Sequence, residues 1–547
     1  MGLDVIPYHK MKALIIEDLA EMRSSMKSML SNMGLSDIES VNNGEEALKR
    51  IQKEHYDIIF SDYELGKGKD GQQILEEVRY SNLIKASSIY ILVTAAQTVD
   101  MVMGALEFEP DGYIVKPVTL DLLRTRLNRI VRTKDIYKEI NKALDRKNID
   151  GALDACNRLA IQKPKFALPA YRIKGRILLN EKRWEEAKDL YETVLGIKRV
   201  AWAVLGMGKV CYQINEFEEA KPLLEGLAAT NSKYVEAQDW LAKVLEAQGK
   251  YKAAQKVLQA AIDESPKSCL RQQELGRVAE LNGDPIAMRK ACRKAISLGK
   301  NSVFAKPEPF IGLAKALQVS IKSGSIRESK LATQESMKLI ESARMDFHLT
   351  SLQNLKCALV EAETLYNSKN EEEGQLAYRL AKNLMDASSD LSIDDQIDVF
   401  SSRLLFETDA EIQKSKQGLL SEIGDNKRLQ TKFYRVIENS LSNKPGERLE
   451  LIKKRATELL DKDDIEDAVE LLVRGMAYPN ADDELKLLGF NAIVSRFEKG
   501  RSDPELLEKG DELSMALGKI PSDNPMHPQI EKFKQRWADV TNEQNEE

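Results

Sequence analysis

Four short runs of apolar residues near the start of the chain are each followed directly by polar residues. The runs cover residues 12–16, 56–60, 89–93 and 112–115, and stretches with helical spacing separate them. Short β-branched runs that alternate with helices predict βα units in a parallel sheet. Because ligands of such sheets bind at the carboxyl ends of the strands, we expect these polar residues to meet at one edge. They are Glu17, Asp18, Asp62, Thr94 and Lys116.

These polar residues have the chemistry of a site for a phosphoryl group. Three crowded carboxylates repel one another unless a cation lies among them, and a site made only of oxygen ligands suits Mg²⁺. The metal also neutralises the charge that builds up on a phosphoryl group during its transfer. A lysine provides a positive charge for phosphate, and a hydroxyl can hydrogen-bond another phosphoryl oxygen. The pattern therefore predicts that a carboxylate, Asp62, becomes phosphorylated; incidental polar strand ends are the alternative.

The strand ends also form motifs that point to a family. The motifs are Glu17-Asp18, Asp62, Thr94-Ala95 and Lys116-Pro117. This combination resembles the receiver domain of two-component response regulators over about residues 11–132. The resemblance implies a flavodoxin-like, doubly wound α/β domain with five parallel strands. It also implies that a histidine kinase or a phosphotransfer protein donates the phosphoryl group to Asp62.

The resemblance further implies how the site holds Mg²⁺. The metal ligands are Asp18, Asp62 and the backbone carbonyl of Glu64, and Glu17 assists through water. The loop after Asp62 departs from the family pattern, since residues 63–69 contain two glycines and are about one residue longer than usual. Because glycine permits unusual backbone dihedrals, we expect this loop beside the metal to be mobile.

The resemblance also implies a switch that follows phosphorylation. Thr94 and Lys116 bind the phosphoryl oxygens, and Tyr113 matches the aromatic residue that rotates inward when the threonine moves. This motion changes the face formed by the fourth helix, the fifth strand and the fifth helix. This face could also form a homodimer, in which its arginines pair with the acidic segment at residues 107–111 of a second receiver. The arginines are Arg124, Arg126, Arg129 and Arg132.

Self-similarity replaces the strand signals after about residue 134. Three segments place an aromatic residue three positions before an alanine, and the alanines, Ala187, Ala220 and Ala254, are spaced by 33 and 34 residues. A small residue stands twelve positions before each alanine, and the same register continues with Gly276 and Met288. A period near 34 with small residues on facing helices resembles tetratricopeptide repeats. We assign residues 133–300 to an all-α solenoid of such repeats.

The period degrades in residues 301–547, although helical spacing continues. Ile465-Glu-Asp-Ala468 resembles another degenerate unit. We therefore interpret residues 301–547 as degenerate helical repeats or a separate α-helical domain. The polar residues 540–547 predict a disordered tail.

One cation follows each small residue of the repeat. In a tetratricopeptide array this position lies on the first helix of each hairpin, which lines the concave surface, so the cations would form a positive stripe. Such a stripe would suit an acidic peptide or a partner helix. The alternative is that these cations are ordinary solvated side chains. Acidic residues on the same helices also keep the groove from being uniformly basic. The cations are Arg176, Lys209, Lys243 and Arg277, with Lys315 as a fifth candidate; the acidic residues are Glu236, Asp239, Glu246 and Glu280.

Composition narrows the classes of function. The 81 Lys and Arg residues against 87 Asp and Glu residues give a net charge of −6, which disfavours wholesale nucleic-acid binding. The five cysteines form no Cys-x-x-Cys pair and are odd in number, which fits a reducing cytoplasm. No apolar run approaches the roughly 20 residues that span a bilayer. We therefore expect a soluble, cytoplasmic protein that does not bind membranes.

These patterns favour a signalling adaptor in a two-component phosphorelay. Phosphorylation of Asp62 would alter how the repeats bind a protein partner, and helical repeats present large recognition surfaces. Beyond self-catalysed phosphorylation and dephosphorylation of the receiver, we expect no enzyme activity. Two alternatives remain: an RNA- or DNA-binding regulator that uses the basic groove, and a phosphatase-like regulator with a hidden site in residues 301–547.

Overall fold

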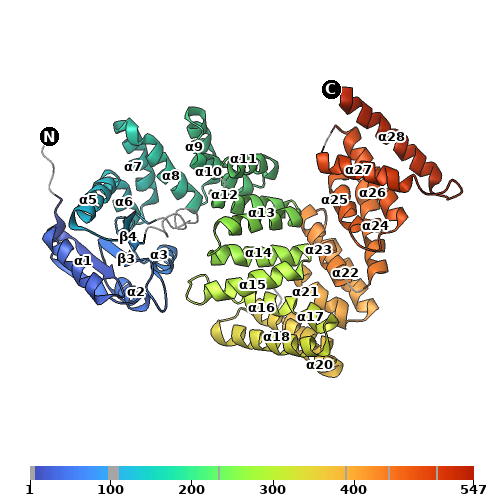
Figure 1. Cartoon of the computed structure of the whole chain (residues 1–547), viewed down its shortest axis with the longest axis horizontal. Coiled ribbons are helices and arrows are strands. Elements are labelled where there is room, and N and C mark those ends of the chain that lie inside the picture. Colours follow the sequence, from blue (N-terminus) through green and yellow to red (C-terminus); the bar gives the residue numbers. More distant parts are fainter. Residues whose placement is uncertain are drawn as a thin grey trace. The chain divides into compact units, whose positions relative to one another are not determined.

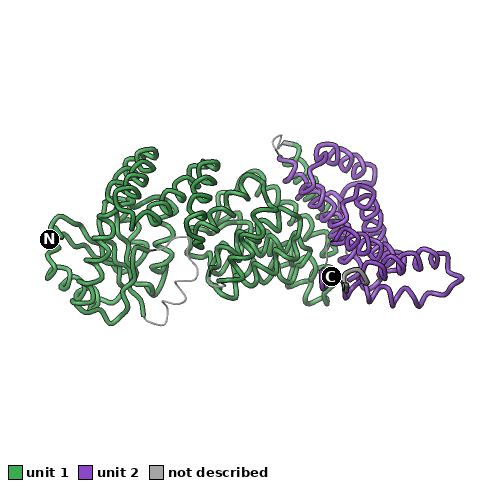
Figure 2. The backbone as a smooth tube through the Cα atoms, turned by 90° about the horizontal axis from the view of Figure 1, so that it is seen from above, with its two compact units in different colours: residues 1–391 green, residues 392–547 purple. Residues whose placement is uncertain are grey.

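The computed structural model describes residues 6–95, 110–231, 234–387, 391–441, 444–500 and 503–546. A five-stranded sheet with covering helices forms the N-terminal part, and helices form the rest of the described chain (Figure 1). The chain divides into two compact units, Met1–Leu391 and Ser392–Glu547 (Figure 2). The sheet, the predicted repeats and residues 301–391 therefore belong to one unit, and the unit boundary lies inside the region predicted as residues 301–547.

The sheet is parallel throughout, with strand order β2-β1-β3-β4-β5. β3 and β4 are buried at every residue because helices cover both faces of the sheet. β2 lies at an edge, and only Ile38 and Val41 of this strand are buried. This arrangement confirms the predicted doubly wound α/β fold. The strands are β1 (Lys12–Ile16), β2 (Asp37–Val41), β3 (Ile58–Asp62), β4 (Ile89–Thr94) and β5 (Gly112–Val115).

Successive residues of each strand point to opposite faces of the sheet. Ala13 and Ile15 pack in one core cluster with residues of α1 and α5, and Leu14 and Ile16 pack in a second cluster with residues of α2 and α3. Residues 96–109, which include most of the predicted acidic segment, lie outside the described residues. The helices are α1 (Ala20–Asn32), α2 (Gly44–Lys53), α3 (Gly71–Tyr80) and α5 (Leu120–Ile136).

The connection to the repeats is almost continuously helical, and no Gly or Pro interrupts it. α5 ends at Ile136, Tyr137 caps it, and α6 (Lys138–Asp145) begins at the next residue. Asp145 accepts a hydrogen bond from the backbone N–H of Ala86 at 2.7 Å, and Lys134 Nζ donates to the Ala86 carbonyl at 2.8 Å. These bonds tie the connection to the loop before β4.

The repeat region consists of helical hairpins in the predicted register. Each predicted small residue lies on the first helix of a hairpin, and each alanine, or Met288 in the last case, lies on the second. Successive helices pack into one continuous hydrophobic core. The helices are α7 (Ile149–Gln162), α8 (Ala167–Asn180), α9 (Trp184–Ile197), α10 (Ala201–Gln213), α11 (Phe217–Thr230), α12 (Val235–Ala247), α13 (Tyr251–Glu264), α14 (Cys269–Asn282) and α15 (Pro285–Gly299).

Glycines allow the helices of neighbouring hairpins to approach closely. A Cβ on Gly206 would lie 2.2 Å from the ring of Tyr191, and a Cβ on Gly175 would lie 2.6 Å from the Tyr191 hydroxyl. Tyr191 is 3% exposed. The aromatic ring that fills the space beside these glycines is therefore Tyr191, rather than the aromatic residue that begins the second helix of the hairpin.

Gly206→Ala should lower the midpoint of thermal unfolding by at least about 2 °C. The added methyl group must displace the Tyr191 ring, and overpacking of a core costs about 1–3 kcal/mol. Gly226→Ala is the matched control, because Gly226 also lies inside a helix and has nothing within 4 Å of its Cβ position. Circular dichroism at 222 nm would measure both midpoints. An equal effect of the two substitutions would contradict the close packing.

Helices continue to the end of the described chain. Unit 1 ends with α16 (Glu308–Ala316), α17 (Gln318–Ser323), α18 (Ile326–Asp346), α19 (Ser351–Asn367) and α20 (Glu371–Ala387). Unit 2 contains α21 (Ile393–Phe406), α22 (Asp409–Ile423), α23 (Lys427–Ser440), α24 (Pro445–Asp461), α25 (Ile465–Met476), α26 (Asp483–Glu498), α27 (Pro504–Leu517) and α28 (His527–Glu546).

Two predictions about unit 2 can be compared with the observed helices. The degenerate motif at Ile465 begins α25, which packs on α24 as a hairpin. The polar segment 540–546, for which the composition predicts disorder, forms the last turns of α28. The helix is anchored just before this segment by Trp537, which is 4% exposed and packs against Phe497. A helix already formed by packing can extend into polar residues at little cost.

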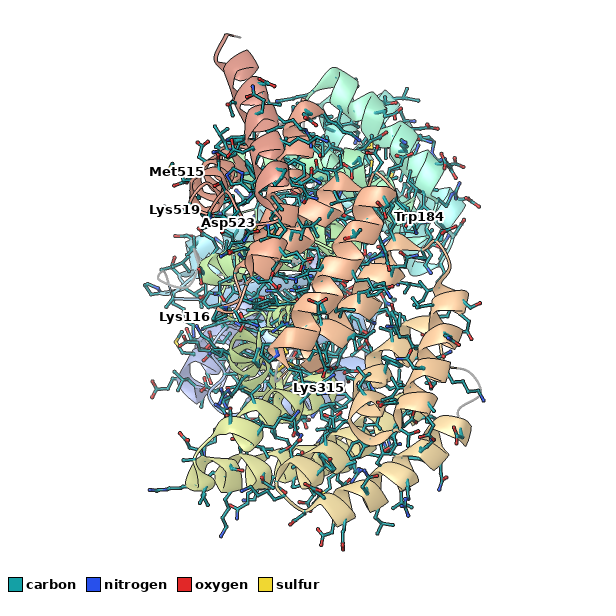
Figure 3. The ribbon with its side chains drawn as sticks, turned by 90° about the vertical axis from the view of Figure 1, so that its right-hand side faces the viewer. Lys116, Trp184, Lys315, Met515, Lys519 and Asp523 are labelled. Carbon is teal, nitrogen blue, oxygen red and sulfur yellow. The ribbon has the colours of Figure 1, made fainter. Side chains whose placement is uncertain are left out.

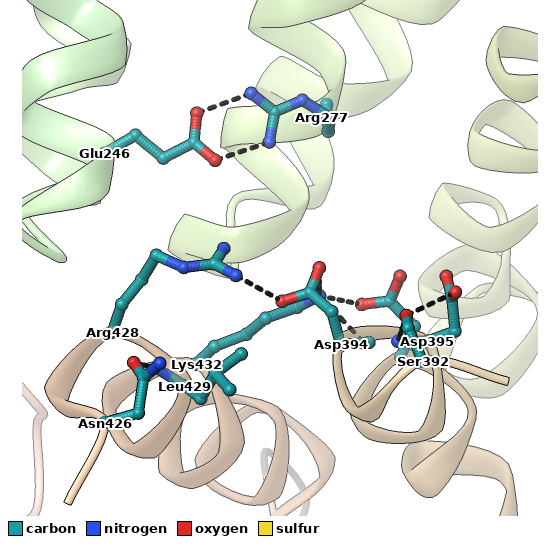
Figure 4. A network of polar contacts seen from close by, with 10 residues as sticks. Glu246, Arg277, Ser392, Asp394, Asp395, Asn426, Arg428, Leu429 and Lys432 are labelled. Atoms are coloured by element: carbon teal, nitrogen blue, oxygen red, sulfur yellow. Dashed lines mark hydrogen bonds and ion pairs between the residues drawn. The ribbon is translucent and has the colours of Figure 1, made fainter. Parts of the chain in front are cut away.

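Buried ion pairs join helices inside unit 2. Lys432 of α23 is 6% exposed and contacts Asp394 at 2.9 Å and Asp398 at 2.6 Å, both on α21. Arg428 contacts Asp394 as well, at 3.0 Å (Figure 4).

The described residues include five cysteines, and all of them are buried and free: Cys156, Cys211, Cys269, Cys292 and Cys357. Among the described residues, no helix combines the length and the apolar character needed to cross a membrane.

Candidate functional site

The carboxyl ends of the strands bring the predicted acidic residues together. Glu17 and Asp18 follow β1, and Asp62 is the last residue of the neighbouring strand β3. One carboxylate oxygen from each of the three residues lies within 4.8 Å of the others. Glu17 and Asp62 are buried, whereas Asp18 is exposed. A cavity of about 110 Å³ beside α1 has Glu17 and Asp62 in its wall.

Lys116, which follows β5, joins the same cluster. Its Nζ lies 2.9 Å from Asp62 Oδ2 and 3.1 Å from Glu17 Oε2. Burial disfavours the charged form of Lys116, but its contacts with Asp62 and Glu17 outweigh this effect and raise its pKa. A single lysine thus bridges two of the three carboxylates.

The carboxylates carry more negative charge than Lys116 compensates. Burial raises the pKa of the Asp62 carboxyl, and Lys116 opposes this rise. Burial and the nearby charge of Asp62 together raise the pKa of Glu17. Crowded oxygen ligands with uncompensated charge fit a hard divalent cation such as Mg²⁺. The residues present therefore suit the metal that the sequence predicts.

The loop after Asp62 lies against this cluster. Gly66 has a φ of +66°, and a Cβ at this position would lie 3.2 Å from Asp18 Oδ2. Glu64 lies in the same loop with its side chain exposed, and the resemblance predicts its backbone carbonyl as a metal ligand. At the far end of the loop, Asp70 caps α3 by accepting a hydrogen bond from the Gln73 N–H at 2.7 Å.

Thr94 and Tyr113 occupy the neighbouring strand ends. Thr94 is the last residue of β4 and is 1% exposed, and its hydroxyl donates to the Ala95 carbonyl at 3.3 Å. Tyr113 on β5 pairs with Leu92 in the sheet and packs at the margin of the core under α2 and α3. The structure therefore brings Glu17, Asp18, Asp62 and Lys116 into one cluster, and it places Thr94 and Tyr113 on strands of the same sheet.

Comparisons with known proteins agree with this geometry. Residues 13–128 match the family model of the response regulator receiver domain, and residues 212–276 match that of the tetratricopeptide repeat. The chain has a receiver domain followed by tetratricopeptide repeats. The receiver is similar to two curated proteins: chemotaxis protein CheY-3 of Vibrio cholerae and chemotaxis protein CheY of Pseudomonas aeruginosa.

Both similarities are confined to the receiver. The Vibrio protein is 27% identical over 128 residues, which are 23% of this chain and 97% of that protein. The Pseudomonas protein is 28% identical over 120 residues, which are 22% of this chain and 95% of that protein. A solved tetratricopeptide repeat protein from Cytophaga hutchinsonii covers 45% of this chain and 95% of its own, with 12% identity and a TM-score of 0.36. The assignment of the repeats rests on the family model and the hairpins.

Three of the predicted cations of the repeat groove are paired with acidic residues of neighbouring hairpins. Lys209 contacts Glu236 at 2.5 Å, and Arg277 contacts both oxygens of Glu246, at 2.5 and 2.7 Å (Figure 4). Lys315, which is labelled in Figure 3, contacts Glu280 at 2.6 Å. Three of the five predicted cations therefore form a ladder of ion pairs, because the solenoid stacks cations and acids of successive hairpins side by side.

Aromatic contacts complete the centre of this ladder. Lys243 lies over the ring of Trp240 with its Nζ 4.2 Å from the centroid, and Lys209 lies 5.4 Å from the same ring. The Trp240 ring also packs edge-on against Tyr212. Arg176, the first predicted cation, lies near enough to Lys134 of α5 that its charge lowers the pKa of Lys134, after the larger effect of burial.

Arg23 of α1 positions the acidic pair, and the sequence reasoning missed it. Its guanidinium donates to the backbone carbonyls of Glu17 and Asp18 at 2.6 and 2.9 Å. These bonds fix the turn that directs both carboxylates to the cluster. A lone arginine in a helix carries no signal by itself, and only its position one turn into the helix after an acidic pair could have pointed to it.

Proposed function

We propose that this protein is a phosphorylation-controlled signalling adaptor of a two-component phosphorelay. The observation that supports the proposal best is Lys116, whose Nζ contacts both Asp62 and Glu17 beside a third carboxylate. A lysine, three carboxylates and a hydroxyl at the ends of adjacent strands can hold a phosphoryl group from several sides. The repeats that follow offer a surface for a protein partner.

The reaction needs one nucleophile and charge compensation. A carboxylate oxygen of Asp62 attacks the phosphorus of a phosphohistidine, the new P–O bond forms, and the P–N bond to the donor breaks. Lys116 moves from Asp62 to a phosphoryl oxygen, and Thr94 donates its hydroxyl to another. Bound Mg²⁺, held by Asp18, Asp62 and the Glu64 carbonyl with Glu17 acting through water, would neutralise the charge that develops.

The output follows from a shift between two conformations. A phosphoryl group adds roughly −1.5 to −2 charges at Asp62. Inward movement of Thr94 and Lys116 leaves room that Tyr113 can occupy, which alters the surface around β5 and α5. A difference of a few kcal/mol between the two states is enough to change which partner the adaptor holds.

The described contacts favour neither of the other functions. Three of the five groove cations are paired with Glu236, Glu246 and Glu280, so these three do not form a free surface for nucleic acid. Three acidic residues of unit 2, Glu450, Asp482 and Glu484, meet at one place. However, Lys453 contacts each of them at 2.6–3.0 Å, and all three side chains are exposed, unlike the buried pair Glu17 and Asp62.

Phosphorylation should change the set of proteins that the immobilised chain captures from its native cell. Capture in acetyl phosphate and Mg²⁺ would be compared with capture in EDTA, and mass spectrometry would measure the proteins retained. Replacement of both Lys209 and Lys243 by Glu should reduce the phosphate-dependent capture. Both ammonium groups lie near the Trp240 ring, so the change makes this part of the groove negative and would repel an acidic partner.

The matched control reverses Lys252 and Lys256, which are exposed on the second helix of the hairpin that carries Trp240. An identical set of captured proteins in the two buffers would refute phosphate control. Equal capture by the two double variants would refute the groove as the binding surface.

A further inference from the structure

The repeat region contacts the loop that follows the predicted phosphoacceptor. The Asn301 side chain donates from Nδ2 to the Gly68 carbonyl at 2.9 Å, and Lys69 Nζ donates to the Asn301 carbonyl at 2.7 Å. The two bonds form a reciprocal pair between residues more than 230 positions apart in the sequence. Asn301 lies just after α15, which ends at Gly299.

Aromatic contacts flank this polar pair. The ring of Phe304, which is 7% exposed, packs edge-on against Tyr80 at the end of α3, with centroids 5.2 Å apart. Lys267, just before α14, lies with its Nζ 6.0 Å from the ring of Tyr63, the residue after Asp62. Residues 301–304 and Lys267 thus contact the receiver near both ends of the loop and at the last residue of α3.

The loop is held within the receiver by backbone hydrogen bonds at its ends, by Leu65, which is 3% exposed in the core, and by Lys69, which contacts Glu77 at 2.8 Å. Tyr63 donates its N–H to the Val93 carbonyl at 2.8 Å, and Gly71 donates to the Tyr63 carbonyl at 3.1 Å. Between these ends, Gly66 and Gly68 have φ values of +66° and +93°, so this stretch lacks the restraint that side chains give a backbone. The bond from Asn301 to Gly68 falls in this stretch, two residues after the glycine beside Asp18.

The same segment is anchored to a helix of the groove. Gln273 of α14 donates from Nε2 to the Phe304 carbonyl at 2.7 Å. α14 also carries Arg277, whose guanidinium binds Glu246 of α12. Residues 301–304 therefore contact both the loop beside the acidic cluster and the first helix of a repeat hairpin.

We propose that Asn301 positions the loop after Asp62, so that metal binding at the acidic cluster is coupled to the packing of residues 301–304 on the receiver. In the docked arrangement Gly66 of the loop lies beside Asp18, and the Glu64 carbonyl of the same loop would be a ligand of the cation. Coupling of two equilibria is reciprocal, so the cation must also strengthen the contact with the repeats. The proposal rests on the proposed function, because it assumes that the cluster binds Mg²⁺.

Asn301→Ala in the full chain should weaken Mg²⁺ binding about 3- to 10-fold, the usual worth of one hydrogen bond. Isothermal titration with Mg²⁺ alone would measure the affinity. Hydrogen exchange should become faster at residues 64–69 in the variant, and in the wild type Mg²⁺ should slow exchange at residues 301–304. Asn301→Asp, which loses the amide donor but keeps the backbone contact of Lys69, should resemble Asn301→Ala.

Asn282→Ala is the matched control, because it removes a side-chain amide that donates at 2.7 Å to Gln255 within the repeats. Unchanged or tighter Mg²⁺ binding in Asn301→Ala relative to Asn282→Ala would overturn the coupling, even with a wild type that binds Mg²⁺. A wild type that binds no Mg²⁺ would overturn the proposed function and the coupling together. Hydrogen exchange distinguishes the two failures, since faster exchange at residues 64–69 tests the contact of Asn301 independently of the metal.

Discussion

Asp62→Asn is expected to abolish labelling of the chain by acetyl phosphate. The side-chain amide has the volume of the carboxylate but lacks its nucleophilic charge, and no P–O bond can form at an amide under these conditions. Lys116 retains its contact with Glu17, so the site should keep its shape. Intact-mass spectrometry would follow the gain of one phosphoryl group in wild type and its absence in the variant.

Two comparisons make this result specific to Asp62. Asp37→Asn changes an exposed carboxylate on the edge strand β2 and should leave labelling unchanged. EDTA should suppress labelling of wild type, because the crowded carboxylates need a cation to admit a phosphoryl group. Uptake of label by Asp62→Asn at the wild-type rate would assign the phosphoacceptor to another residue.

The central strands and the clustering of the polar residues could be predicted, because both depend on short apolar runs and on the residues that directly follow them. β1, β3 and β4 are short apolar runs, and residues that follow them in a parallel sheet must meet at one edge. β2 was not among the apolar runs, because this strand buries only Ile38 and Val41 and reads Asp37-Ile-Glu-Ser-Val41. Its presence followed only from the resemblance to the receiver family.

The repeats were also predictable, because close packing leaves a signature in residue size. Gly175, Gly206 and Gly208 each lie so close to a side chain of another helix that a methyl group would collide with it. The pairing of the groove cations was harder to predict. The acidic residues were visible in the sequence, but Lys209 reaches Glu236 and Arg277 reaches Glu246 only because of how successive hairpins stack.

Contacts across long sequence distances carried no signal at all. Asn301 is an ordinary polar residue after a helix, and nothing near it in the sequence indicates that Gly68 lies beside it. The unit boundary after Leu391 was equally hidden, since helical spacing continues on both sides of it. Local pattern thus identified each part, while the joints between parts depend on side chains that only the folded chain brings together.

Lys116→Met should slow labelling by acetyl phosphate about 10- to 100-fold and leave the acceptor unchanged. A hydrogen bond to a charged group is worth about 1.5–3 kcal/mol, and the Lys116 ammonium is placed to make one to the incoming phosphoryl group. Methionine keeps an unbranched chain of similar length, so the loss reports the charge. The rate would come from a time course of intact mass at saturating Mg²⁺.

The control for this variant is Lys27→Met, which removes an exposed lysine of α1 outside the cluster and should label at the wild-type rate. Lys116→Met should slow labelling more than the removal of another positive charge does, because Lys116 Nζ lies within 3.1 Å of both Asp62 and Glu17. Without it the two buried carboxylates face each other uncompensated, so the variant should depend more steeply on Mg²⁺ than wild type does. A Lys116→Met protein with an unchanged rate and an unchanged Mg²⁺ dependence would show that this contact serves only the resting fold.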